Sequence, residues 1–164
     1  MPPLEPLIRT TAIRATSPDA IERVLAAAGE GCEIEQPWLE RVRGGLERVV
    51  DLLAADPALA RAALIEPAAA GLEARRRQGQ AIDRLAERLA PRPGELFEEE
   101  QLPECVALMS VGAVAGLIGD EVRTGRAEEL PARLPDLLFV MLVPYLGPQV
   151  AALEMQRVAV QRGT

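Results

Sequence analysis

Apolar residues in this chain recur at spacings of three and four, in segments that begin with a capping residue and a proline. The clearest stripe follows Gln36-Pro37 and consists of Trp38, Val42, Leu46, Val49, Val50 and Leu53. This spacing places one side of a helix against a core. Ser17-Pro18 and Asp56-Pro57 repeat the start signal, since proline fits the first turn of a helix. Because no segment alternates apolar and polar residues as a strand does, we predict an all-α helical bundle of about six to seven helices.

The breaks between the periodic segments predict the helix bounds. Glycine at 29 and 147 and proline at 67 and 91 interrupt the pattern, because these residues most often end or bend helices. Helices are expected at about 18–28, 37–53, 57–65, 69–90, 103–124 and 128–146, with a short terminal helix after Gly147-Pro148. We interpret residues 1–35 as a lead-in with one short helix and residues 36–162 as the main domain.

The sequence contains no histidine. Histidine is the commonest general base and a usual ligand of zinc and haem, so its absence removes most nucleophilic and metal-dependent mechanisms. The alternative of a small enzyme that uses carboxylates alone would depend on Glu98–Glu100 or on the pair Asp120 and Glu121. We interpret these acidic residues as a solvated loop and an exposed helix end. No enzyme activity, cofactor or metal is therefore expected.

The charge balance opposes nucleic-acid binding. The chain has 18 basic and 25 acidic residues, a net charge of −7, whereas proteins that bind phosphate backbones concentrate positive charge on one face. The run Arg75-Arg76-Arg77 points in different directions around a helix. We interpret it as solvated surface.

The two cysteines, Cys32 and Cys105, lie far apart and form no metal-ligand spacing. Two free thiols are expected, with Cys105 a small buried apolar residue. The apolar runs Cys105–Gly119 and Leu137–Leu146 fall short of the roughly 20 residues that cross a membrane. With no secretory leader pattern at the N-terminus, we expect a cytoplasmic protein without a membrane segment.

Small residues form a stripe within the predicted 103–124 helix, at Gly112, Ala115, Gly116 and Gly119. Each glycine inside a helix costs about 1 kcal/mol relative to alanine, so the stripe needs a physical reason. Close approach of another backbone is one such reason. The partner could be the 128–146 helix of the same chain or a second copy in a homodimer. Small residues also leave room for an apolar ligand between helices.

Three segments carry a resemblance to a known family: WLERVRGGLERVVDLLAADPALARAALIEPAAAG, AIDRLAERL and VALMSVGAVAGLIGDEVRTGRAEELPARLPDLLFVMLVPYLGP. From Trp38 to about Ala152 the chain resembles the C-terminal ligand-binding and dimerisation domain of TetR/AcrR-type transcriptional regulators. The third segment is the most specific. The N-terminal helix-turn-helix domain of that family is not present, because the residues before Trp38 contain neither an aromatic residue nor the characteristic turn.

The resemblance implies a sensing domain that dimerises and binds a small, mostly apolar effector, without direct nucleic-acid binding by this chain. The dimer interface would come from residues 106–122 and 134–146, with Gly112, Ala115, Gly116, Gly119, Leu134, Leu138, Met141 and Tyr145. The effector pocket, by position, would be lined by Trp38, Leu64, Ile65, Leu85, Phe97, Met109 and Ala113. From the residues alone, Trp38 and Met109 are expected to be core residues more often than ligand contacts. An alternative is a stand-alone interaction protein that forms a heterodimer with a full-length regulator.

Overall fold

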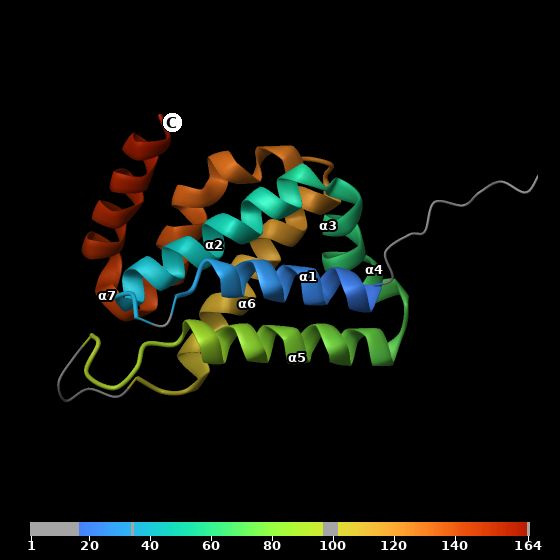
Figure 1. Ribbon diagram of the computed structural model, residues 1–164, viewed down its shortest axis with the longest axis horizontal. Coiled ribbons are helices and arrows are strands. Elements are labelled where there is room, and N and C mark those ends of the chain that lie inside the picture. The colour runs from blue at the N-terminus through green and yellow to red at the C-terminus, as the bar shows by residue number, and fades with distance from the viewer. Residues whose placement is uncertain (1–16, 34, 97–101, 164) are drawn as a thin grey trace, which may run out of the picture.

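The computed structural model describes residues 17–33, 35–96 and 102–163. These residues form seven α-helices and one short 3₁₀ helix, and no strand occurs among them. The elements are α1 (Ser17–Glu30), α2 (Trp38–Ala55), α3 (Pro57–Leu64), α4 (Glu66–Ala69), α5 (Leu72–Leu89), α6 (Cys105–Arg123), η1 (Ala127–Glu129) and α7 (Leu130–Arg162). The prediction of an all-α bundle is confirmed (Figure 1).

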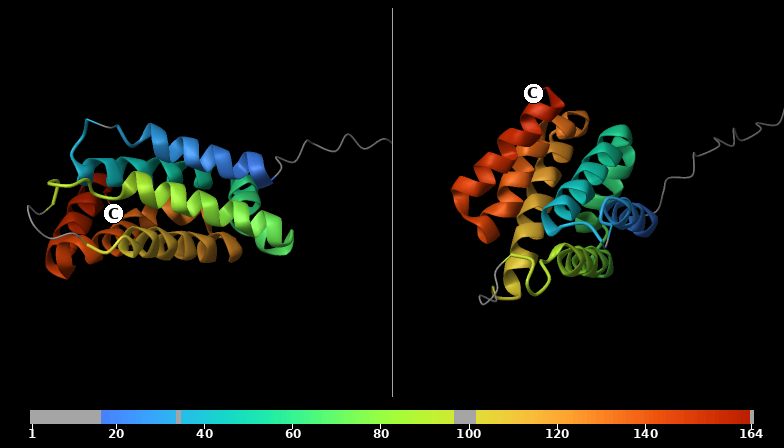
Figure 2. Two further views of the ribbon diagram at one scale, coloured as in Figure 1. Left: turned by 90° about the horizontal axis from the view of Figure 1, so that it is seen from below. Right: turned by 60° about the vertical axis from the view of Figure 1, so that its left-hand side comes forward.

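The helix α6 lies between other helices of the bundle. It packs against α5 on one side and against α7 on another, and α3 also contacts it. Helix α1 lies beside α5 and contacts α2 and α3, so α1, α2 and α5 together cover one side of α6 (Figure 2). The core is built from aliphatic side chains of all the long helices. This arrangement makes α1 part of the same core as the helices that follow it.

The start of α3 follows the local chemistry that the sequence predicts. The Asp56 side chain accepts a hydrogen bond from the backbone N–H of Leu59 at 3.0 Å, and Pro57 occupies the first helical position. This bond satisfies one of the N–H groups that the first turn of a helix leaves unpaired. Helix α3 then ends at Leu64, three residues before Pro67, as predicted.

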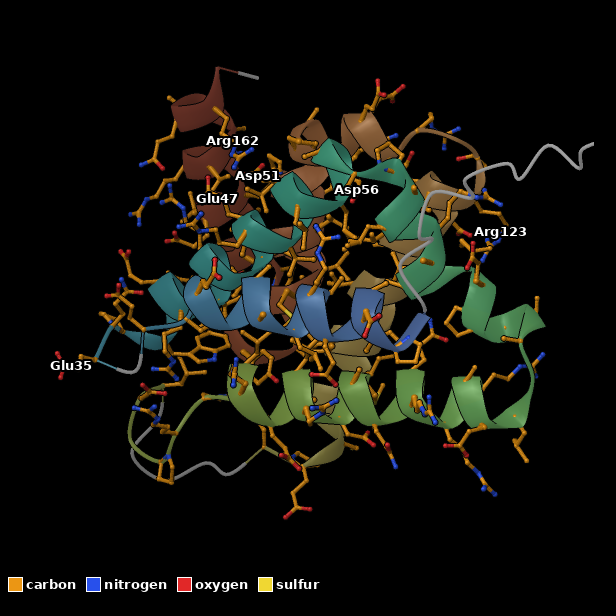
Figure 3. The ribbon with its side chains drawn as sticks, turned by 45° about the vertical axis from the view of Figure 1, so that its right-hand side comes forward. Glu35, Glu47, Asp51, Asp56, Arg123 and Arg162 are labelled. Carbon is orange, nitrogen blue, oxygen red and sulfur yellow. The ribbon has the colours of Figure 1, made fainter. Side chains whose placement is uncertain are left out.

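Helix α7 bends sharply at Gly147, where the sequence predicts a break. The backbone of Gly147 has φ 73° and ψ 165°, and Pro148 follows it. The segment after the bend lies along α2, where Arg162 pairs with Glu47 and also lies 3.6 Å from Asp51 (Figure 3). Residues 148–162 thus continue as a helix that docks on α2.

Two local predictions differ from the structure. Gly29 does not end α1, which continues to Glu30. Cys105 is exposed at the first residue of α6, so the prediction that it is buried is wrong. A residue in the first turn has few neighbours from its own helix, and no other element among the described residues covers this one. Cys32 is the buried thiol, and its Sγ donates to the carbonyl oxygen of Arg41 at 3.1 Å.

The close backbone approach in this fold occurs between α1 and α2. A Cβ atom placed on Gly44 would lie 2.3 Å from the carbonyl oxygen of Gly31. Such a distance is shorter than any van der Waals contact, so only glycine fits at this crossing. The role that the sequence assigns to the glycines of α6 belongs here to Gly31 and Gly44.

Candidate ligand-binding cavity

A cavity of about 340 Å³ lies between α5 and α6, beneath α1 and α2. Its lining is mostly aliphatic, with Leu25 from α1, Leu46 from α2, Leu64 from α3, Ile82 from α5 and Ile118 from α6 among the residues that face it. The volume falls within the range of about 300–1,000 Å³ that is usual for small-molecule sites. The shape and chemistry of the space therefore suit a small apolar molecule.

The glycines of α6 help to create this space. Gly112, Gly116 and Gly119 all line the cavity, and a Cβ atom placed on any of them would have nothing within 4 Å. Gly119 is also buried, so the emptiness beside it is internal. The predicted close approach by the 128–146 helix of the same chain does not occur at these glycines, and their approach by a second copy stays a prediction. They border open space that the packing of α7 against α6 does not fill, and Gly116 is exposed. Ala115, the fourth residue of the stripe, lines the same cavity.

The other predicted interface residues lie inside their own chain. Leu134, Leu138, Met141 and Tyr145 are all at most 5% exposed. Side chains that are already buried cannot lose further surface to a second copy, so their assignment to a dimer interface is corrected. They belong to the side of α7 that faces the core, and Met141 reaches the cavity.

The predicted pocket residues divide between the cavity and its surroundings. Leu64 and Leu85 line the cavity. Ile65 packs against the core without facing the space, because it lies at the break between α3 and α4. Phe97 lies outside the described residues.

Met109 and Ala113 lie on the outer face of α6. Met109 is 67% exposed, and Ala113 is exposed beside it. Their assignment to the pocket is corrected, since neither residue lines the cavity. A periodic pattern identifies the faces of a helix, but two of the faces of α6 are apolar. The sequence offers no signal that tells the inner face from the outer one.

Trp38 has a structural role at one end of the cavity. Its indole N–H donates to the carbonyl oxygen of Leu89 at 2.7 Å, which pairs one of the last carbonyl groups of α5. Its ring lies 4.9 Å from the Tyr145 ring at an interplanar angle of 59°. Trp38 is buried and does not line the cavity, whereas Leu89 does.

Four residues of α1 line the cavity, although the sequence analysis did not place them in the pocket. They are Ile21, Val24, Leu25 and Ala28. They form the apolar side of the short helix that we expect at 18–28. The periodic signal was present, but a pattern does not say which core a lead-in helix joins.

Two polar side chains contribute to the lining, Gln78 from α5 and Arg123 from the end of α6. Arg123 is mostly exposed and pairs with Asp120 one turn before it. Gln78 is half-buried, and its Nε2 donates to the carbonyl oxygens of Ala63 and Leu64. The other acidic and basic side chains that the structure describes lie outside the cavity. Within the described residues, no three His, Cys, Asp or Glu side chains gather in an arrangement that could hold a metal ion.

A partly buried ion pair holds the segment after α5 against α2. Arg41 is buried, and its guanidinium donates to both carboxylate oxygens of Glu95. These hydrogen bonds hold the pKa of Glu95 at about 2, well below its usual range.

Near this pair, burial raises the pKa of the Cys32 thiol, which disfavours the reactive thiolate.

No family model matches this chain, and no curated protein or solved structure matches it either.

By length and composition alone, two stretches of the described residues could cross a membrane, Cys105–Arg123 and Ala127–Arg162. One third of each apolar window is buried inside the bundle. Core helices of soluble proteins pass the same test, so this finding carries little weight.

Proposed function

We propose that this chain is an effector-binding and dimerisation domain of the TetR type, which binds a small apolar molecule between α5 and α6. The observation that carries the proposal is the aliphatic cavity of about 340 Å³. Protein cores are normally packed to the density of organic crystals, so the apolar side chains around this partly open space have fewer dispersion contacts than core residues usually have. A ligand that fills the space recovers those contacts.

The size of the cavity sets the size of the ligand. An engineered cavity of about 150 Å³ with an aliphatic and aromatic lining stays dry and binds benzene. The cavity in this protein, at about 340 Å³, is about twice as large. A benzene ring with a chain of a few carbons is therefore a suitable probe, and propylbenzene meets this description.

Thermal unfolding with and without propylbenzene tests the binding half of the proposal. A ligand that binds only the native state raises the melting temperature, and the rise grows with ligand concentration. We expect a saturable increase. A melting temperature that stays constant up to the solubility limit of propylbenzene would contradict the proposal.

The outer face of α6 supports the dimerisation half. Met109 and Leu117 are 67% and 42% exposed on this face. The 15 residues from Cys105 to Gly119 include no charged side chain. We therefore assign this face to a second copy of the chain, with α6 packed against its symmetry mate.

Light scattering after size exclusion tests this assembly. The native chain is expected to be a dimer at micromolar concentration, and Met109→Glu is expected to be a monomer because it places a charge in the interface. Leu72→Glu is the matched control, since Leu72 is equally exposed at 67% but lies at the start of α5. A monomeric native chain, or a dimer that Met109→Glu leaves intact, would overturn the assignment.

A further inference from the structure

Gln78 replaces a hydrogen bond that a proline removes from the end of α3. In a continuous helix the carbonyl oxygen of Ala63 would accept from the N–H of residue 67, but Pro67 has no N–H. The Nε2 group of Gln78 donates to this oxygen at 3.3 Å and to the carbonyl oxygen of Leu64 at 3.2 Å. Gln78 thus pairs two carbonyl groups at the end of α3.

These two bonds fix the orientation of the Gln78 amide. Only the amide nitrogen can donate, so the atom that faces the two carbonyl groups is Nε2 and the other is Oε1. No residue of the described chain donates to Oε1. Gln78 also lines the cavity, whose other lining residues apart from Arg123 are apolar, so Oε1 is the side-chain acceptor that this lining can offer to a ligand.

The other polar group in the lining determines the charge of a suitable ligand. Arg123 is already paired with Asp120, so this pair has no net charge. A carboxylate would also meet the Gln78 Oε1 atom, and two acceptors repel each other. A neutral hydroxyl group avoids both problems, because it can donate to Oε1.

We propose that the ligand is a neutral apolar molecule with one hydroxyl group, and that this hydroxyl donates to Oε1 of Gln78. The apolar part then lies against the aliphatic walls and the glycines of α6. This inference rests on the proposed function, since it describes the ligand of the same cavity. Gln78 would be the residue that selects a hydroxylated molecule over a plain hydrocarbon.

Two probes that differ only in the hydroxyl group test the inference: 4-propylphenol and propylbenzene. Isothermal titration calorimetry gives the dissociation constant of each probe, and the measured quantity is the ratio of the two constants for one variant. Gln78→Met keeps a side chain of similar length and removes the acceptor. Ile82→Leu is the control, because Ile82 lines the cavity one turn further along α5 and has no polar group.

We expect native protein to bind 4-propylphenol at least as tightly as propylbenzene. In Gln78→Met the hydroxyl loses its partner, so the affinity for 4-propylphenol should fall roughly fivefold or more relative to propylbenzene. Ile82→Leu should leave the ratio unchanged. Gln78→Lys serves as a second variant, because lysine can still donate to the α3 carbonyl groups but offers no acceptor. The same relative loss is expected for it.

The outcomes separate the inference from the proposed function. If both probes bind and their ratio is the same in native protein, Gln78→Met and Gln78→Lys, the inference is overturned while the cavity remains a binding site. If neither probe binds native protein, the proposed function fails and the inference fails with it. A selective loss of 4-propylphenol binding in both variants at position 78 supports the inference.

Discussion

The guanidinium of Arg41 donates to the two carboxylate oxygens of Glu95 at 2.5 and 2.9 Å. Arg41 also donates to the carbonyl oxygen of Gln36 at 3.0 Å, and Glu95 accepts from the backbone N–H of Arg92 at 2.6 Å. These bonds connect the start of α2 with the segment that follows α5. Since Leu89 at the end of α5 lines the cavity, the ion pair helps to hold one wall of the cavity in place.

Glu95→Gln is expected to lower the free energy of unfolding by about 1–3 kcal/mol at pH 7, because it leaves the buried charge of Arg41 without its partner. Chemical denaturation measures this change. Glu73→Gln is the control, since the pair of Glu73 and Arg77 is exposed and contributes little. Equal effects of the two substitutions would contradict the importance of the buried pair.

The contribution of Glu95 to stability should depend on pH in a defined window. Hydrogen bonding to Arg41 lowers the pKa of Glu95 from 4.5 to about 2 in the folded protein. A lowered pKa adds stability that is fully present above pH 4.5 and is lost as the pH falls through about 2. The difference in unfolding free energy between native protein and Glu95→Gln should therefore narrow between these values. A difference that stays constant down to pH 2 would speak against the pair.

Two glycine-to-alanine substitutions should change stability in opposite directions. Gly112→Ala is expected to stabilise the protein by about 0.5–1 kcal/mol, because its Cβ meets nothing within 4 Å and alanine favours the helix. Gly44→Ala should destabilise it, since the added Cβ would lie 2.3 Å from the carbonyl oxygen of Gly31. Denaturant unfolding of both variants checks the contrast. A loss of stability in Gly112→Ala would show that α6 is tightly packed at this point.

Gly147→Ala should strain the bend in α7. Residues with a side chain rarely adopt φ 73° with ψ 165°, and holding alanine there costs about 1–3 kcal/mol. The variant should show lower stability and faster hydrogen exchange in residues 148–162, where the terminal segment docks on α2. Gly79→Ala, in an exposed and regular part of α5, is the control and should not destabilise the protein. Unchanged exchange in the terminal segment would contradict this prediction.

The helix bounds were predictable because local chemistry sets them. Asp56 and Pro57 start α3 through a side-chain cap and a preset φ angle, and both properties belong to the residues themselves. Pro67 and Gly147 interrupt helices for equally local reasons. No knowledge of the surrounding fold is needed for these predictions.

The role of the α6 glycines was not predictable in the same way. A close backbone contact and an open cavity both require small residues. The spacing of Gly112, Gly116 and Gly119 is therefore compatible with both explanations. The outcome depends on where α5 and α7 pack, which is a property of the whole bundle. The same reason explains why Met109 proved exposed and Met141 buried, although both lie in apolar stretches.

The hydrogen bonds of the polar residues around the cavity could not be predicted from the sequence either. Pro67 shows that the carbonyl group of Ala63 lacks its helical partner, but it does not identify the residue that replaces the bond. Gln78 does so because α4 and the turn after it bring α5 back beside α3. The pairing of Arg41 with Glu95 likewise joins residues that only the fold brings together.

The most direct test of the binding site is calorimetric titration of propylbenzene into native protein, Gly119→Leu and Gly79→Leu. Gly119 is buried and faces the cavity, so a leucine side chain there should fill the space. Gly79 is exposed and does not line the cavity, so the same substitution there is the matched control. We predict saturable binding to native protein and Gly79→Leu, and loss of binding in Gly119→Leu. Equal binding by all three proteins would contradict the site between α5 and α6.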